Sequence, residues 1–300
     1  MKNQLIGLRN IQSYKKFLKT KMNKKSANIK QLKGISKKIR QNILKMIVKA
    51  NGGYLADSLG VVDIFCALYF GGVLNHDPKR PNMKDRDKVI LSDTHVCPTL
   101  YATLAEAEYF PKRELWSFRN FGSALQGHAV YKSTAGVENP SPSFGQGLSV
   151  AVGMAYAMRY FEKSNQMVYC VSSDEELNQG QTWEAIMFAA KHKLPNLTMI
   201  INRDNIQSDG NTEEIMPIEP LKDKYKAFNW KVINVDGNDI NEIIQACVKA
   251  REIHEKPVCI IANTISGKGI KFLESGFKWN EDSLQENEIK DAFKSLGIKV

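Results

Sequence analysis

The chain has 300 residues, of which 43% are hydrophobic and 25% are charged, a composition typical of a globular protein with a sizeable core. No apolar run approaches the length of a membrane span and no secretory leader is visible, which argues against a membrane protein and favours a cytoplasmic location. The five cysteines are scattered and odd in number, so we expect reduced core thiols and neither a disulfide framework nor a zinc site.

Basic residues are concentrated at the start of the chain. Residues 1–56 contain 15 Lys or Arg and no acidic residue, whereas in the remainder 27 basic residues face 32 acidic ones. We therefore expect a basic, partly structured arm at residues 1–33 and one domain at residues 34–300. Such an arm could contact nucleic acid or an anionic surface. It could also be a solvated leader or a helix packed on a partner. We favour these two alternatives, because Tyr14 and Phe17 form no base-stacking pattern.

Apolar periodicity predicts mainly helices in the first half of the chain. Residues that recur at three- and four-residue steps from Ile35 indicate a helix, which should end where Asn51, Gly52 and Gly53 favour a tight turn. The helix expected at residues 148–161 is rich in small residues, which permits close packing against a strand or at a subunit interface. Further helices are expected at residues 61–69, 100–107, 112–121 and 148–161, and a short strand at residues 89–91.

Strands and helices alternate in the second half. Strands are expected at residues 167–171, 197–201, 231–235 and 258–262, and helices at 181–191 and 240–253. This alternation predicts an α/β fold, with a parallel sheet that helices cover on both faces. No internal repeat or low-complexity linker interrupts the pattern, so we expect a single domain after the arm.

Acidic residues follow two of these strands at the points where the strands end. Asp174 comes after the strand at 167–171, and Asp204 comes after the strand at 197–201. Two adjacent parallel strands would bring these carboxylates together at one sheet edge, with a main-chain carbonyl near Ile206 in reach. Oxygen ligands of this kind suit a small hard cation such as Mg²⁺. Alternatively, both are ordinary solvated loop residues.

Six motifs in the chain are long, specific and collinear. They are LYATLAEAEYFP at residues 100–111, LQGH at 125–128, GQGLSVAVGMAYA at 145–157, ELNQGQTWEAIMFAAKHKLPNLT at 176–198, SDGNTEEIMPIEPL at 208–221 and SGKGIKFLE at 266–274. With these motifs, residues 35–280 resemble the N-terminal, thiamine diphosphate-binding half of a transketolase. The resemblance is in particular to the split form, in which this half is a separate subunit.

The resemblance implies a PP-type thiamine diphosphate-binding fold and the transfer of a two-carbon ketol unit between small sugar molecules. It implies thiamine diphosphate and Mg²⁺ (or Ca²⁺ or Mn²⁺) as cofactors. The substrates would be sugar phosphates or an unusual sugar. The glutamate that activates the cofactor lies on the C-terminal half, so a partner subunit is needed, and the assembly would be a dimer of such pairs.

The resemblance also assigns roles to individual residues. Asp174, Asp204 and Ile206 match the metal ligands. His95 and His128 match two active-site histidines, and His95 is the one that contacts the cofactor phosphate. Tyr54 stands where the family has a third, substrate-facing histidine. The other cofactor contacts would be Ser141, Pro142, Phe144 and Glu175.

Several residues depart from the family's pattern around the cofactor. Glu175 and Pro142 replace glycines, Asp204 replaces an asparagine ligand, and Tyr54 and Asn280 replace histidines. One hypothesis is an active subunit with divergent substrate choice. A second is a catalytically silent scaffold or regulatory subunit that binds the cofactor weakly or not at all. A third makes the basic arm the functional element, as a tether to a surface or to nucleic acid.

Overall fold

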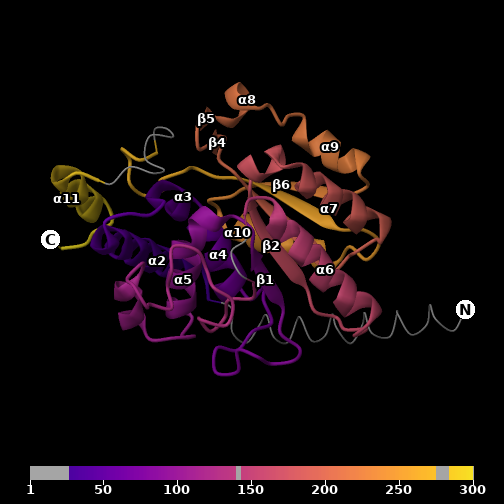
Figure 1. Ribbon diagram of the computed structural model, residues 1–300, viewed down its shortest axis with the longest axis horizontal. Helices are drawn as coiled ribbons and strands as arrows, with labels where there is room; N and C mark the ends of the chain where they lie inside the picture. Colours follow the sequence, from indigo (N-terminus) through magenta and orange to yellow (C-terminus); the bar gives the residue numbers. More distant parts are fainter. Residues whose placement is uncertain (1–26, 140–142, 275–283, 300) are drawn as a thin grey trace, which may run out of the picture.

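The computed structural model of the chain describes residues 27–139, 143–274 and 284–299. At its centre lies a five-stranded sheet, in which every neighbouring pair of strands is parallel (Figure 1). Its strands, in spatial order, are β1 (Lys88–Leu91), β2 (Val168–Ser173), β3 (Leu197–Arg203), β7 (Val258–Asn263) and β6 (Lys231–Asp236). The expected parallel α/β fold is confirmed.

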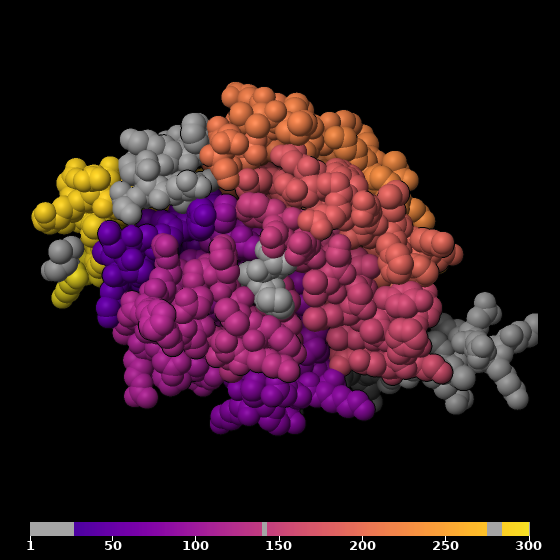
Figure 2. Space-filling model, in the orientation of Figure 1, coloured from indigo at the N-terminus to yellow at the C-terminus, as the bar shows by residue number. Residues whose placement is uncertain are grey.

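Helices cover both faces of the sheet because successive side chains of a buried strand point to opposite sides. One apolar core lies between the sheet and α2, α4, α5 and α10, and the other lies between the sheet and α6, α7 and α9. These helices are α2 (Ile29–Ala50), α4 (Val62–Phe70), α5 (Cys97–Glu106), α6 (Gln146–Tyr160), α7 (Gly180–Lys191), α9 (Leu221–Ala227) and α10 (Ile240–Arg251). The face in Figure 2 shows α6 and α7 in pink to red, with the orange segment that contains α8 and α9 above them.

Shorter elements surround this framework. They are the helices α3 (Leu55–Gly60), α8 (Thr212–Ile215) and α11 (Glu286–Ser295), the hairpin of β4 (Ile206–Gln207) and β5 (Gly210–Asn211), and the 3-10 helices η1 (Thr94–Val96), η2 (Lys112–Ser117) and η3 (Glu175–Asn178). The hairpin, α3, α8, α9 and α11 were not anticipated. The hairpin and α8 are too short to show an apolar period.

The first helix begins earlier than the apolar period predicts. We expected a start at Ile35, but α2 begins at Ile29. Asn28 caps it, since its side chain accepts from the backbone of Gln31 at 2.9 Å and the Gln31 side chain accepts from the backbone of Asn28 at 2.9 Å. Leu32 is already buried in the core. The helix ends as expected at Asn51, which adopts the left-handed conformation with φ 49°.

The predicted amphipathic helix at residues 112–121 is wrong in type and length. The segment forms the 3-10 helix η2, which ends at Ser117. Arg119 then turns the chain with φ 60°, a conformation that an α-helix cannot include. Leu115 and Phe118 are buried, and these two apolar contacts account for the sequence pattern without a continuous helix.

Some predictions fall outside the described residues. These are the greater part of the basic arm, residues 1–26, together with Ser141, Pro142 and Asn280. The predicted boundary at residues 33 and 34 lies within α2. Within the described ranges, no helix combines the length and the apolar character needed to cross a membrane.

Candidate functional site

The carboxyl ends of β2 and β3 lie side by side, as the sequence analysis expected. Ser173 is in register with Asn202, and the backbone N–H of Asp174 donates to the carbonyl of Asn202 at 3.1 Å. The parallel register therefore brings Asp174 and Asp204 to the same edge of the sheet. The two carboxylates are close enough that the charge of Asp174 raises the pKa of Asp204.

Asp174 is fully buried, and only one of its oxygens is hydrogen-bonded within the described residues. Its Oδ2 accepts from Arg203 Nη1 at 2.6 Å and from the backbone N–H of Asn205 at 3.0 Å, while Oδ1 has no hydrogen-bond partner there. Burial raises the pKa of Asp174 to about 6, although the Arg203 guanidinium opposes the shift. Leaving a buried acceptor unpaired costs about 1–3 kcal/mol. A ligand that bound to Oδ1 would remove this cost.

Asp204 supplies the second carboxylate of this edge. Its Oδ1 accepts from the backbone N–H of Ile206 at 3.1 Å, and Oδ2 accepts from the Asn202 side chain at 3.4 Å. Desolvation raises the pKa of Asp204 well above its usual range, and repulsion from Asp174 and Asp57 adds to the shift. An excess of negative charge with little water around it favours a bound cation.

The donor set fits a hard divalent cation. It consists of the unpaired Asp174 Oδ1 and the Asp204 carboxylate, which are all oxygens, and the backbone N–H of Ile206 donates to Asp204 at 3.1 Å. No three His, Cys, Asp or Glu side chains of the described ranges group together in a way that would hold a metal ion. A metal at this edge would therefore depend on further oxygens, such as those of water and phosphate.

Glu175 is directed towards the hairpin that follows β3. It is the first residue of η3, and its Oε1 accepts from the hydroxyl of Ser208 at 2.9 Å and from the backbone N–H of Ser208 at 3.4 Å. Ser208 lies in the turn between β4 and β5. These hydrogen bonds hold the extra carboxylate in place beside Asp174.

Glu176, which the sequence analysis did not single out, joins three segments at this edge. Its buried carboxylate accepts from the Ser92 hydroxyl after β1, from the Gly145 backbone N–H at 2.8 Å and from the Ser173 backbone N–H at 2.9 Å. Burial raises the pKa of Glu176, and these hydrogen bonds partly offset the increase. The contacts fix the start of α6 relative to the ends of β1 and β2.

An aromatic cluster unites three of the predicted site residues. The rings of Tyr54 and His95 stack with centroids 3.6 Å apart and planes 16° from parallel, and Phe144 meets His95 edge-on at 4.7 Å. They come from the start of α3, from η1 and from the segment before α6. Asp57, which the sequence analysis missed, places Oδ2 3.6 Å from His95 Nδ1. The packing holds the imidazole in one orientation.

A pocket of about 410 Å³ opens beside this cluster and brings another predicted site residue, His128, to the same place as Tyr54 and His95. Arg119, a wall residue that the sequence analysis missed, adds a positive charge, and its exposure allows it to meet an anion. No apolar period or motif marks Arg119, because its position depends on the turn after η2. The lining residues are Asn51, Gly52, Gly53, Tyr54, His95, Pro98, Phe118, Arg119, Gly127 and His128.

Comparison with known proteins identifies the family. The family model described as "Transketolase, thiamine diphosphate binding domain" matches residues 32–300. The chain is 38% identical over 258 residues to the 6-deoxy-6-sulfo-D-fructose transketolase subunit of Clostridium sp. (strain MSTE9), covering 86% of this chain and 93% of that one. It is 36% identical over 278 residues to an apulose-4-phosphate transketolase subunit of Actinobacillus succinogenes, covering 92% and 99%.

The fold agrees with these sequence relatives. The solved transketolase of Campylobacter jejuni matches with a TM-score of 0.84 and 31% identity, over 91% of this chain and 44% of that chain. The present chain thus corresponds to less than half of a full-length transketolase and to nearly the whole of the relatives that are named as subunits. The chain belongs to the transketolase family, as a transferase subunit built on the thiamine diphosphate-binding domain.

Proposed function

We propose that this chain binds thiamine diphosphate and a divalent metal, and that it transfers a two-carbon ketol unit between sugars together with a separate C-terminal-half subunit. The observation that carries the proposal is the unpaired, buried Oδ1 of Asp174 at the sheet edge. An orphaned acceptor beside a second carboxylate is the arrangement expected of a metal site whose cation also binds phosphate. Relatives named as transketolase subunits favour this function over a silent scaffold.

The residues at the sheet edge would hold the cofactor. Asp174, Asp204 and the carbonyl of Ile206 would bind the metal, which is Mg²⁺, Mn²⁺ or Ca²⁺. His95 would contact the diphosphate, and the remaining contacts would come from Ser141, Pro142, Phe144 and Glu175. When bound, thiamine diphosphate supplies the electron sink that carbon–carbon bond cleavage requires. What this chain adds is position, charge compensation and proton transfer.

Proton transfer falls to the histidines of the pocket. His95 and His128 line the same cavity as Tyr54, and histidine is the side chain that ordinarily gains and loses a proton near neutral pH. Stacking on Tyr54 keeps the His95 ring in a fixed plane, with Asp57 beside its Nδ1. Tyr54 would donate a hydrogen bond to a sugar hydroxyl, which a phenol can do without changing its charge.

The pocket favours a sugar that carries an anionic group. Arg119 and His128 are exposed on its wall and can pair with a phosphate or a sulfonate. The names of two relatives specify 6-deoxy-6-sulfo-D-fructose and apulose-4-phosphate, which are both anionic sugars. We therefore propose a sugar phosphate or an unusual anionic sugar as substrate, a role in carbohydrate metabolism and a cytoplasmic location.

The lengths of the related proteins support a proposal about the assembly. Full-length transketolases are more than twice as long as the part that matches this chain. We propose that a C-terminal-half subunit supplies the activating glutamate, and that two such pairs form the complete enzyme.

Calorimetric titration tests the proposal directly. Thiamine diphosphate and Mg²⁺ are titrated into the chain mixed with its partner subunit, and micromolar binding that disappears in EDTA is expected. Asp174→Asn should weaken the metal-dependent binding at least tenfold, because it removes the charge of a ligand. Asp223→Asn is the matched control, since Asp223 is exposed and pairs only with Lys226 among the charged residues of the described ranges. No heat and no thermal stabilisation at millimolar cofactor would contradict the proposal.

A further inference from the structure

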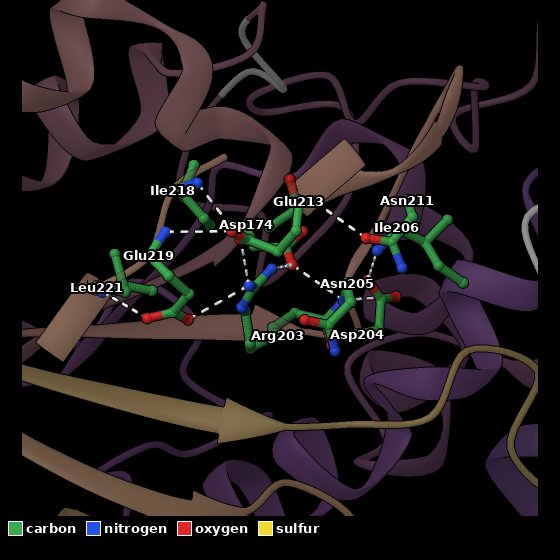
Figure 3. A network of polar contacts seen from close by, with 12 residues as sticks. Asp174, Arg203, Asp204, Asn205, Ile206, Asn211, Glu213, Ile218, Glu219 and Leu221 are labelled. Carbon is green, nitrogen blue, oxygen red and sulfur yellow. Dashed lines mark hydrogen bonds and ion pairs between the residues drawn. The ribbon is translucent and has the colours of Figure 1, made fainter. Parts of the chain in front are cut away.

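Arg203 is a buried cation directly beside the proposed metal ligand. It is the last residue of β3, and its side chain is only 4% exposed. Its Nη1 donates to Asp174 Oδ2 at 2.6 Å, while Nη2 donates to Glu213 Oε1 at 2.7 Å and to Glu219 Oε1 at 3.3 Å (Figure 3). One guanidinium thus spans from the sheet edge to two acidic residues near the surface.

The two outer carboxylates hold the guanidinium in place. Glu213, in α8, also accepts from the backbone N–H groups of Ile218 at 3.3 Å and Glu219 at 3.4 Å, and Glu219 accepts from the backbone of Leu221 at 2.6 Å. In Figure 3, Ile218, Glu219 and Leu221 lie on the side of Arg203 away from Asp204, and Glu213 lies above it. Because Arg203 is anchored from outside, its contact with Asp174 does not depend on a metal.

This contact decides which oxygen of Asp174 remains for a cation. Oδ2 already accepts two hydrogen bonds, from Arg203 and from the backbone of Asn205, whereas Oδ1 accepts none within the described residues. A carboxylate binds a metal through both oxygens only if each oxygen has a free lone pair, and the two hydrogen bonds occupy both lone pairs of Oδ2. Asp174 is therefore restricted to a single metal–oxygen bond.

We propose that Arg203 is a positioning residue that determines metal selectivity, by restricting Asp174 to one-oxygen binding and so favouring Mg²⁺ and Mn²⁺ over Ca²⁺. This inference rests on the proposed function, because it assumes a metal at this edge. Mg²⁺ binds about six oxygens at about 2.0–2.1 Å in octahedral geometry, whereas Ca²⁺ takes about six to eight at about 2.3–2.6 Å and often uses both oxygens of a carboxylate. Arg203 also offsets one of the two negative charges, which makes the site less dependent on a tightly held cation.

Displacement of Mn²⁺ provides the test. The full chain, mixed with its partner subunit, is loaded with thiamine diphosphate and Mn²⁺. Free Mn²⁺ is measured by electron paramagnetic resonance, and Mg²⁺ or Ca²⁺ is added as competitor. In the wild type, Mg²⁺ should displace Mn²⁺ at a lower concentration than Ca²⁺ does. In Arg203→Met, Oδ2 keeps only the hydrogen bond from Asn205 and regains one lone pair, so the ratio of the two concentrations should shift towards Ca²⁺ by about tenfold, the effect of roughly one further oxygen ligand.

Arg251→Met is the matched control. Arg251 is also buried and paired with a carboxylate, that of Asp87. Asp87 directly precedes β1 and so lies at the amino ends of the strands, whereas Asp174 and Asp204 follow the carboxyl ends. The Arg251→Met variant should lose stability without any change in the Mg²⁺ to Ca²⁺ ratio.

Each result has one meaning. An unchanged ratio in a folded Arg203→Met variant would overturn the inference and leave the proposed function standing. If that variant does not fold, the wild type still decides, since more effective displacement by Ca²⁺ than by Mg²⁺ would contradict one-oxygen binding. Absence of Mn²⁺ binding to the wild type would overturn the metal site, and with it both this inference and the proposed function.

Discussion

Two glycines of α6 provide a sharp test of how closely this helix approaches the sheet. A Cβ at Gly147 would lie 2.4 Å from Cα, Cβ and Oγ of Ser92, whereas a Cβ at Gly153 would meet no atom within 4 Å. The backbone of Ser92 is held by its hydrogen bond to the carbonyl of Val171 at 2.8 Å, and its hydroxyl donates to Glu176. Ser92 therefore cannot move aside without disturbing the end of β1.

The two substitutions should change the free energy of unfolding in opposite directions. Replacing a helical glycine by alanine raises the free energy of unfolding by about 1 kcal/mol where space is free, so Gly153→Ala should stabilise the chain by about that amount. At Gly147 the same gain is opposed by overpacking, which costs about 1–3 kcal/mol and more when backbone must move. A separation of 2.4 Å lies far inside van der Waals contact, so a net loss of about 2 kcal/mol is expected.

Urea unfolding of the full chain at one pH measures both variants. Midpoints should separate in opposite directions from the wild type with an unchanged slope, because the surface exposed on unfolding stays the same. Gly147→Ala should also weaken thiamine diphosphate binding, since α6 begins directly after Phe144 and Gly145. Equal midpoints for the two variants would refute the close approach of α6 to β1.

Three further outcomes are expected. Tyr54→Leu, assayed with the partner subunit, should lower kcat/KM at least tenfold while urea unfolding changes by only about 1 kcal/mol, the value of one ring stack on His95; unchanged kinetics would contradict a role for the stack. Burial lowers the pKa of His76, so below about pH 6.5 the unfolded chain binds a proton that the folded chain does not, and stability should fall between pH 7.5 and 5.5. Thermal unfolding of His76→Gln should show a weaker decline, and an equal one would exclude His76 as its source. Arg251→Met should lower the free energy of unfolding in urea by about 3–5 kcal/mol, because it leaves the buried Asp87 carboxylate without its cation. Adding Asp87→Asn should recover part of that loss.

Much of the fold was predictable because the period of apolar residues reports local geometry directly. The strands begin and end within two residues of the expected positions, and the left-handed Asn51 closes α2 where two glycines follow. The long helix α6 and the parallel pairing were likewise visible, since strand and helix patterns alternate along the chain. Local patterns failed at η2, where the positive φ of Arg119 ends the segment and leaves no trace in hydrophobicity.

The sequence by itself determined which chemical groups follow the strands, and the motifs identified the family to which they belong. Only the tertiary structure decided what those groups contact. Arg203 ends β3 and Asp204 directly follows it, but their opposite roles depend on the register of β3 with β2, which places one guanidinium nitrogen on Asp174. The stacking of Tyr54 on His95 likewise joins segments 41 residues apart. Such contacts depend on strand order and helix packing, which no local period of side chains encodes.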